Sequence, residues 1–245
     1  MEIQKLLNNE LNHLRDELLN LKKCQITFFT LSISATALLL SIAFKFDDKG
    51  TLSITPHLQI LLSLSPLLIL LPCWWIIFDK ASTITRIVGY YRVVESSLTN
   101  NLDVPIRYIG WENALKEFRQ KQNTLPISDY TTPKCKRSIK KLFFSLKTAH
   151  RFWVIIWWTY FILSFLCIII AVMLLLCVHK HEAKEMVCGN MFIDYIDNII
   201  IISGFVIFVW SAYVTSMMVC RLVYGRYSYN ANEKIWIELL KAIAN

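Results

Sequence analysis

The stretch FWVIIWWTYFILSFLCIIIAVMLLLCV, from Phe152 to Val178, decides the fold class of this chain. It contains no charged side chain and exceeds the ~20 residues with which an α-helix crosses the ~30 Å hydrocarbon core of a bilayer. Three similar runs lie at Cys24–Phe44, Leu58–Phe78 and about Ile196–Val219. The sequence therefore predicts an all-α, polytopic membrane protein with four transmembrane helices and a cytoplasmic helical layer.

The composition of the whole chain agrees with a membrane protein. Of the 245 residues, 55% are hydrophobic and the mean hydropathy is +0.44. Charged residues make up only 18%, whereas they make up roughly 25% of a typical soluble domain. These values exclude an ordinary soluble enzyme, a disordered tail and a disulfide-rich secreted module.

Lysine and arginine are distributed unevenly between the connections. Residues 1–23, 79–151 and 220–245 together hold twenty-two of the 26, and the other two connections hold four. Because basic residues collect on the cytoplasmic side of a membrane, both termini and the middle segment are predicted to be cytoplasmic. The same rule accounts for the net charge of +8 without a direct nucleic-acid partner.

The chain thus divides into five predicted parts. They are a cytoplasmic amphipathic helix (1–23), a first transmembrane hairpin (24–78), a cytoplasmic helical segment (79–151), a second transmembrane hairpin (152–219) and a cytoplasmic tail helix (220–245).

A leucine seam runs along the first part, with spacings of four and three residues. It consists of Leu7, Leu11, Leu14, Leu18 and Leu21. This heptad pattern is typical of a short coiled coil, which would make the protein a homo-oligomer. The alternative is an amphipathic helix that packs on the middle segment of its own chain.

Within the middle segment, helices are predicted over residues 80–98, 105–122 and 134–150, the first as an extension of span two. The last one has an apolar face edged by basic residues, namely Lys136, Arg137, Lys140, Lys141 and Lys147. Such a helix suits the surface of an anionic inner leaflet, where each basic residue adds about 1 kcal/mol. Ordinary topology-setting charge explains the same residues.

The spans carry no charge at mid-depth, but spans one and four carry stripes of Ser, Thr, Gly and Ala. Close helix packing explains such residues, and a weakly polar pore lining in an oligomer is the sharper alternative. Asp194 and Asp197 lie one turn apart at the outer end of span four. In an oligomer they would form an acidic pore mouth of the kind that attracts cations. Otherwise they are two exposed interfacial aspartates.

Two further residue types are informative in span two and span three. Pro66 and Pro72 each remove a helix hydrogen bond and are expected to bend span two. Tryptophans gather at the inner ends of these spans, where the amphipathic indole ring prefers to lie. They are Trp74, Trp75, Trp153, Trp157 and Trp158.

No sequence motif for catalysis is present. The chain lacks phosphate-binding loops, G-x-S-x-G, H-E-x-x-H and C-x-x-C, so neither an enzyme activity, a metal site nor a cofactor is predicted. Cys177 and Cys188 are near enough in sequence to form a bridge in an oxidising compartment, and free thiols are the alternative.

The order of parts resembles a known family. An amphipathic N-terminal helix, a tight two-span hairpin and a following cytoplasmic helix resemble the SLATT-type transmembrane effectors of bacterial conflict systems. The stretch RIVGYYRVVE (Arg86–Glu95), with Trp111 and Glu112 downstream, is similar to stretches in bacterial multipass proteins. The likeness is architectural, covers about residues 1–120, and departs from the two-span plan at the second hairpin. It implies a membrane part that permeabilises the inner membrane when a partner detects infection.

Three functions follow from these features. The first is an oligomeric inner-membrane effector or pore for antiviral defence, controlled by a cytoplasmic protein partner. The second is a non-conducting membrane scaffold or accessory subunit that recruits a soluble partner. A small-solute transporter is the third, and it is disfavoured because the spans lack charge.

Overall fold

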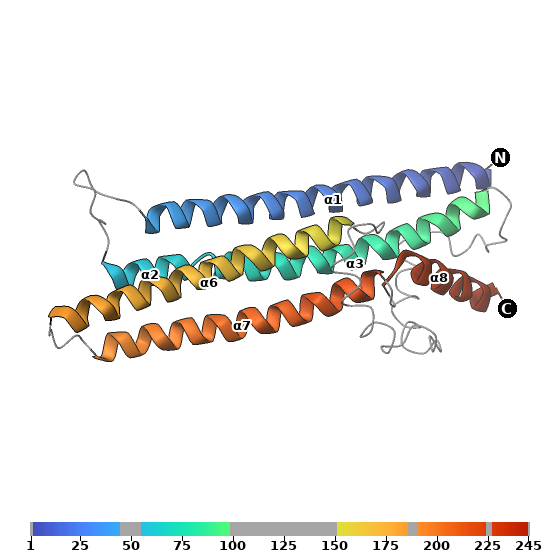
Figure 1. Ribbon diagram of the computed structural model, residues 1–245. Coiled ribbons are helices and arrows are strands. Elements are labelled where there is room, and N and C mark those ends of the chain that lie inside the picture. The colour runs from blue at the N-terminus through green and yellow to red at the C-terminus, as the bar shows by residue number, and fades with distance from the viewer. Residues whose placement is uncertain (1, 45–54, 99–150, 186–190, 224–226, 245) are drawn as a thin grey trace. The chain divides into compact units, whose positions relative to one another are not determined.

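The computed structural model describes residues 2–44, 55–98, 151–185, 191–223 and 227–244 (Figure 1). The helices predicted at 105–122 and 134–150 lie outside the described residues. The proposed lipid contacts on the second of them lie there too: Lys136, Arg137, Lys140, Lys141 and Lys147.

Every regular element in the described ranges is an α-helix. These helices are α1 (Glu2–Ala43), α2 (Pro56–Leu64), α3 (Leu67–Leu98), α6 (Arg151–Glu185), α7 (Met191–Val223) and α8 (Tyr229–Ala244). Four stretches are long and apolar enough to cross a membrane, at Gln4–Ala43, His57–Ser96, Arg151–Val178 and Tyr195–Val223. The predicted all-α fold with four candidate spans is confirmed.

Two helices differ in extent from a simple span. The heptad segment and span one form a single helix, α1, because no helix-breaking residue separates Leu21 from Cys24. Span two continues past Phe78 to Leu98 within α3, as the sequence predicts. Each of the two helices is therefore continuous over a polar part and an apolar part.

The structure separates into two compact units. The four-span unit comprises Thr27–Ile77 and Phe152–Ser216. The second unit, here called the terminal unit, comprises Met1–Ile26, Phe78–Arg151 and Met217–Asn245, and so holds both chain ends. Each unit has its own set of packing contacts and is described separately.

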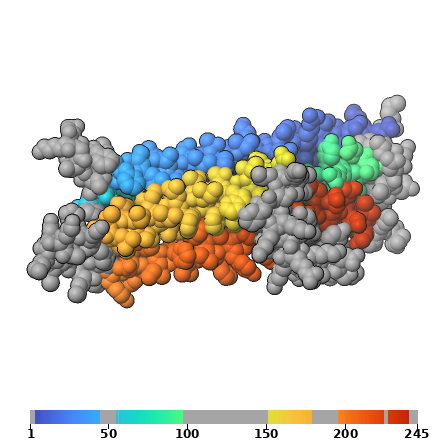
Figure 2. Space-filling view, viewed as in Figure 1, coloured from blue at the N-terminus to red at the C-terminus, as the bar shows by residue number. Residues whose placement is uncertain are grey.

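Span two is the most enclosed of the four candidate spans. In the most apolar 18-residue stretch of this span, 56% of the stretch is buried. The corresponding stretches in α1, α6 and α7 are 17%, 28% and 22% buried. Leu70, Trp74 and Ile77 on α3 are fully buried. The surface of the four-span unit seen in Figure 2 is made by α1, α6 and α7. Apolar side chains on that surface suit contact with lipid tails rather than with water.

Pro66 ends one helix and begins the next in span two. It has no N–H to donate to the carbonyl of Leu62, and the Ser65 hydroxyl donates to that oxygen instead, at 2.7 Å. A side-chain donor thus satisfies the carbonyl that the proline leaves without its helical partner. Pro72, in contrast, does not interrupt the helix, because α3 continues through this residue.

The first prediction concerns the orientation of the spans. Reporter fusions at Gly50 and Gly189 are expected to report the periplasm, and fusions at Asn123 and Asn245 the cytoplasm. The reason is that the connections containing the second pair carry most of the basic residues. Paired alkaline phosphatase and fluorescent-protein fusions measure this, and any one fusion on the wrong side breaks the four-span topology.

Candidate functional site

The terminal unit is built around a buried tryptophan of α8. Trp236 is fully buried beside Ile235 and Leu239 of the same helix, and its ring lies 5.0 Å from that of Tyr90 on α3. The cluster also contains Leu7 and Leu14 of α1, and Ile87, Val93 and Val94 of α3. Three helices from distant parts of the sequence therefore share one core.

The leucine seam of α1 faces this core. Leu7 and Leu14 are 5% and 1% exposed, and Leu11, Leu18 and Leu21 are partly buried against the same cluster. This packing is the arrangement expected from the alternative in which the helix covers its own chain. Assembly of copies through the seam stays a prediction.

Helix α8 lies very close to α3 at Gly89. A Cβ atom at this position would lie 2.8 Å from Cβ of Asn232 and 3.0 Å from the backbone nitrogen of Glu233. Real Cβ atoms do not come so close to a neighbour. Gly89 is therefore required for the helices to touch, which explains a glycine in the interior of a helix, where it costs about 1 kcal/mol relative to alanine.

Asn232 is the polar centre of the contact. It is fully buried, and its amide nitrogen donates to Oγ1 of Thr85 at 3.3 Å and to the carbonyl of Ser228 at 3.2 Å. Because Thr85 already donates its hydroxyl hydrogen to Ser82, it acts as the acceptor here, which supports this orientation of the amide. Among the described residues, Oδ1 of Asn232 has no hydrogen-bond partner.

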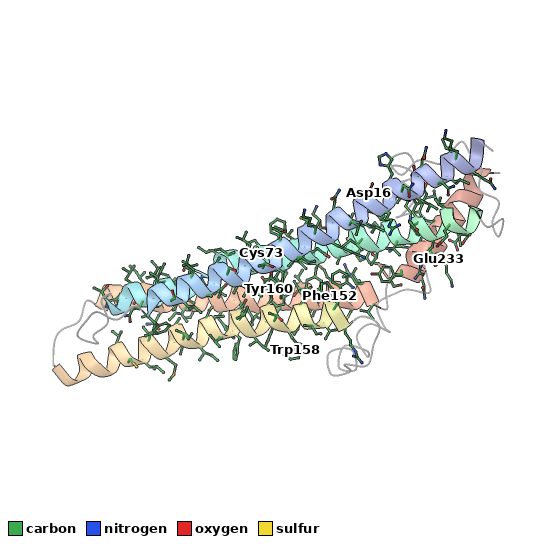
Figure 3. All side chains as sticks on the ribbon, turned by 90° about the horizontal axis from the view of Figure 1, so that it is seen from above. Asp16, Cys73, Phe152, Trp158, Tyr160 and Glu233 are labelled. Carbon is green, nitrogen blue, oxygen red and sulfur yellow. The ribbon has the colours of Figure 1, made fainter. Side chains whose placement is uncertain are left out.

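Two arginines of α3 flank this centre. Arg92 pairs with Glu233 at 3.0 Å and lies 5.8 Å from the ring centroid of Tyr229, so it contacts the first turns of α8, where Figure 3 labels Glu233. Arg86 lies 5.5 Å from the ring centroid of Tyr227, and its carbonyl accepts the indole N–H of Trp236 at 3.1 Å. The arginines and the glycine all come from the stretch Arg86–Glu95.

We call Thr85, Arg86, Gly89, Tyr90 and Arg92 the α8-docking surface. Four of these residues lie in the stretch Arg86–Glu95, to which the sequence pattern assigned no role. A glycine between two arginines at three-residue spacing was the available signal. It could not be read without knowing that α8 returns to this face of α3.

The four-span unit has a second set of polar contacts, all between helices. The hydroxyls of Ser32 on α1 and Tyr160 on α6 are 2.6 Å apart, and the indole N–H of Trp157 donates to Oγ1 of Thr215 on α7 at 3.1 Å. The ring of Trp74 on α3 stacks on that of Tyr160 at 6.0 Å. In Figure 3, Tyr160 and Trp158 lie on opposite sides of α6.

These contacts change the interpretation of the tryptophan belt. Trp74, Trp153 and Trp157 are at most 7% exposed, and Trp74 and Trp157 contact residues of neighbouring helices instead of facing lipid. Trp75 is 40% exposed and Trp158 is half-buried, which leaves them available to a membrane interface. The hydroxyls of Ser32 and Thr215 likewise serve helix packing within the chain.

Asp197 is not an isolated interfacial carboxylate. It is 6% exposed, and its Oδ2 lies 2.7 Å from Nδ1 of His57 at the start of α2. This partner, 140 residues away, was not anticipated from the sequence. Asp194 also belongs to α7, but its side chain lies outside the described part. The acidic pore mouth therefore stays a prediction, with His57 now beside one of its two members.

The described residues offer little for metal or thiol chemistry. No group of three His, Cys, Asp or Glu side chains that could hold a metal ion occurs among them. Cys177 is exposed and forms no disulfide with another described cysteine, and Cys188 lies outside the described residues, so the bridge between them stays a prediction.

Comparison with known proteins found no matching family model, no matching curated protein and no matching solved structure.

Proposed function

We propose that this protein is a non-conducting membrane scaffold that receives a soluble protein partner at its terminal unit. The four-span unit anchors the chain in the bilayer, and the terminal unit, to which α8 and the first part of α1 belong, supplies the residues that contact the partner. This function was the second of the three that the sequence suggests.

The observation that carries this choice is where the polar atoms of the spans lie. The hydroxyls of Ser32, Tyr160 and Thr215 form hydrogen bonds inside the four-span unit. Most side chains that α7 turns outward are apolar or aromatic, such as Ile202, Val206 and Trp210, at 60–61% exposed, and the exposed hydroxyl of Ser203 donates to the carbonyl of Ile200 in the same helix. A water-filled pore lined by α7 would need the opposite arrangement.

The terminal unit has apolar side chains that its own core does not use. Leu6 and Leu19 on α1 are 48% and 56% exposed, on a stretch rich in polar residues. Exposed leucines of this kind on a folded helix are candidates for a protein contact.

A test of the scaffold compares two leucines of similar exposure on one helix. A photo-crosslinking amino acid at Leu19 is expected to capture a soluble protein in cells, and one at Leu38 is expected to capture lipid only. Leu38 is 62% exposed and belongs to the four-span unit, so it controls for exposure. Soluble adducts at both positions, or at neither, would contradict the proposal.

The oligomeric pore effector, with the defence role implied by the SLATT resemblance, is the second candidate. Much of the apolar surface of α6 and α7 is free for assembly, and the Ser203 side chain on α7 is exposed. Here the acidic residues Asp194 and Asp197 would line the mouth.

Membrane potential separates the two candidates. Induced expression, with and without the genomic neighbours, is expected to leave the potential and dye exclusion of bacterial cells unchanged. Depolarisation would instead favour the effector. In that case Asp194→Asn with Asp197→Asn should reduce the cation preference of the current in planar bilayers, because carboxylates at a pore mouth attract cations.

A further inference from the structure

We infer that α8 is a releasable latch, which docks on α3 in the resting protein and is withdrawn when a partner with an apolar groove binds it. This rests on the proposed function, because it names the part of the terminal unit through which the partner acts.

The centre of the latch is paired incompletely. Asn232 is fully buried, yet its Oδ1 accepts no hydrogen bond from the described residues. A buried polar atom without a partner costs about 1–3 kcal/mol, and water restores its hydrogen bond when the helix leaves. The docked state therefore carries a cost that the released state does not.

The ion pair and the cation–π contact at the rim of the α3–α8 contact contribute little to the free energy of docking. Arg92 and Glu233 form an ion pair, but their side chains are 42% and 33% exposed. Exposed ion pairs contribute about 0–1 kcal/mol, and a cation–π contact at an exposed site about 0.5–1 kcal/mol. Docking thus depends on the apolar face of α8, with Trp236 at its centre.

A released α8 would need a partner. Its sixteen residues are near the length at which an isolated helix is marginal in water, and its apolar face holds Ile235, Trp236 and Leu239. Amphipathic helices of this kind bind in apolar grooves of other proteins. A lipid surface fits less well, because the two lysines of α8 are balanced by two glutamates, whereas interfacial helices are rich in basic residues.

Release of α8 would act close to the last span, because only a short connection joins α8 to α7. Helix α7 ends at Val223 and α8 begins at Tyr229, and the backbone N–H of Tyr227 donates to the carbonyl of Arg221 at 3.0 Å. A partner that takes α8 therefore holds the chain only a few residues beyond span four.

Hydrogen exchange of the full-length protein in nanodiscs, followed by mass spectrometry, tests the latch. In the wild type, amides of α8 are expected to exchange at least about tenfold faster than amides of α3 between residues 85 and 94, because α8 opens without the rest of the unit. Equal rates in the two segments would overturn the proposal, since α8 would then open only with the whole unit.

Two variants should move the rate in opposite directions. Gly89→Ala places a methyl group against the backbone of α8 and is expected to raise its exchange about tenfold or more. Asn232→Leu keeps the side-chain size and removes the unpaired oxygen. The two acceptors of the lost amide keep another hydrogen bond, because the backbone N–H of residue 232 still donates to the Ser228 carbonyl and the Thr85 hydroxyl still donates to Ser82. We expect it to slow α8 exchange about fivefold or more.

Gly204→Ala in α7 is the matched control. A Cβ there meets only Cδ1 of Leu67, at 3.6 Å, which is an ordinary contact, so α8 exchange should not change. Faster exchange in Asn232→Leu would contradict the latch even if Gly89→Ala fails to fold. Faster α8 exchange on addition of anionic vesicles would replace the protein partner by a lipid surface. None of these readouts needs the partner, so the latch can fail while the scaffold stands.

Discussion

Leu14→Asp is expected to unfold the terminal unit, whereas Leu19→Asp on the same helix should leave it folded. Leu14 is 1% exposed in the core around Trp236, and an aspartate there would be buried without a cation. Burial of an unpaired charge belongs to the substitutions that cost more than about 4 kcal/mol. Leu19 is 56% exposed, and a surface change of this kind costs about 0.5 kcal/mol or less.

The measurement is protease sensitivity of α8 together with the molecular mass of the detergent-solubilised protein. An unfolded terminal unit in Leu14→Asp supports the intrachain role of the leucine seam. A folded unit with a reduced mass would instead place the seam between copies of the chain. A reduced mass in Leu19→Asp alone would move assembly to the outward face of α1.

His57→Ala is expected to destabilise the four-span unit by more than the loss of imidazole packing alone would. It leaves the carboxylate of Asp197, which is 6% exposed, without its 2.7 Å partner. Removing one member of a buried pair costs about 3–5 kcal/mol, and because the His57 side chain is 32% exposed we expect about 1–3 kcal/mol.

A double-mutant cycle isolates this pair from the cost of lost packing. His57→Ala combined with Asp197→Ala should lower the thermal midpoint by less than the sum of the single variants, with a coupling of about 1 kcal/mol or more. Ile199→Ala is the control on the same part of α7, since Ile199 is 47% exposed and has little packing to lose. Additive effects of the two variants would mean that the pair contributes nothing.

The spans could be predicted from sequence because crossing a bilayer needs only length and apolar composition. The stretch Phe152–Val178 has both, and α6 covers it. The continuation of α3 to Leu98 was also predictable, since no proline follows Pro72 before Leu98. These features depend on neighbours within one helix.

The contacts that form the candidate site could not be predicted in the same way. Gly89 has a role only once Asn232 is placed against it, and the chain between them is long. The pairing of His57 with Asp197 likewise depends on which helices become neighbours. For the same reason, Trp74 was expected at a lipid interface and is instead buried beside Tyr160. Composition indicates that such rings avoid water, but it does not say which neighbour covers them.

The three-helix core has a consequence for the order in which the protein is made. Leu7 and Leu14 leave the ribosome more than 200 residues before Trp236, which packs in the same cluster. During translation the leucine face of α1 therefore has no permanent cover from its own chain, and a holding chaperone would have to shield it. A premature stop before Trp236 would leave that face uncovered for good. Quality-control proteases should then remove a product truncated at residue 228 even though all four spans have been inserted.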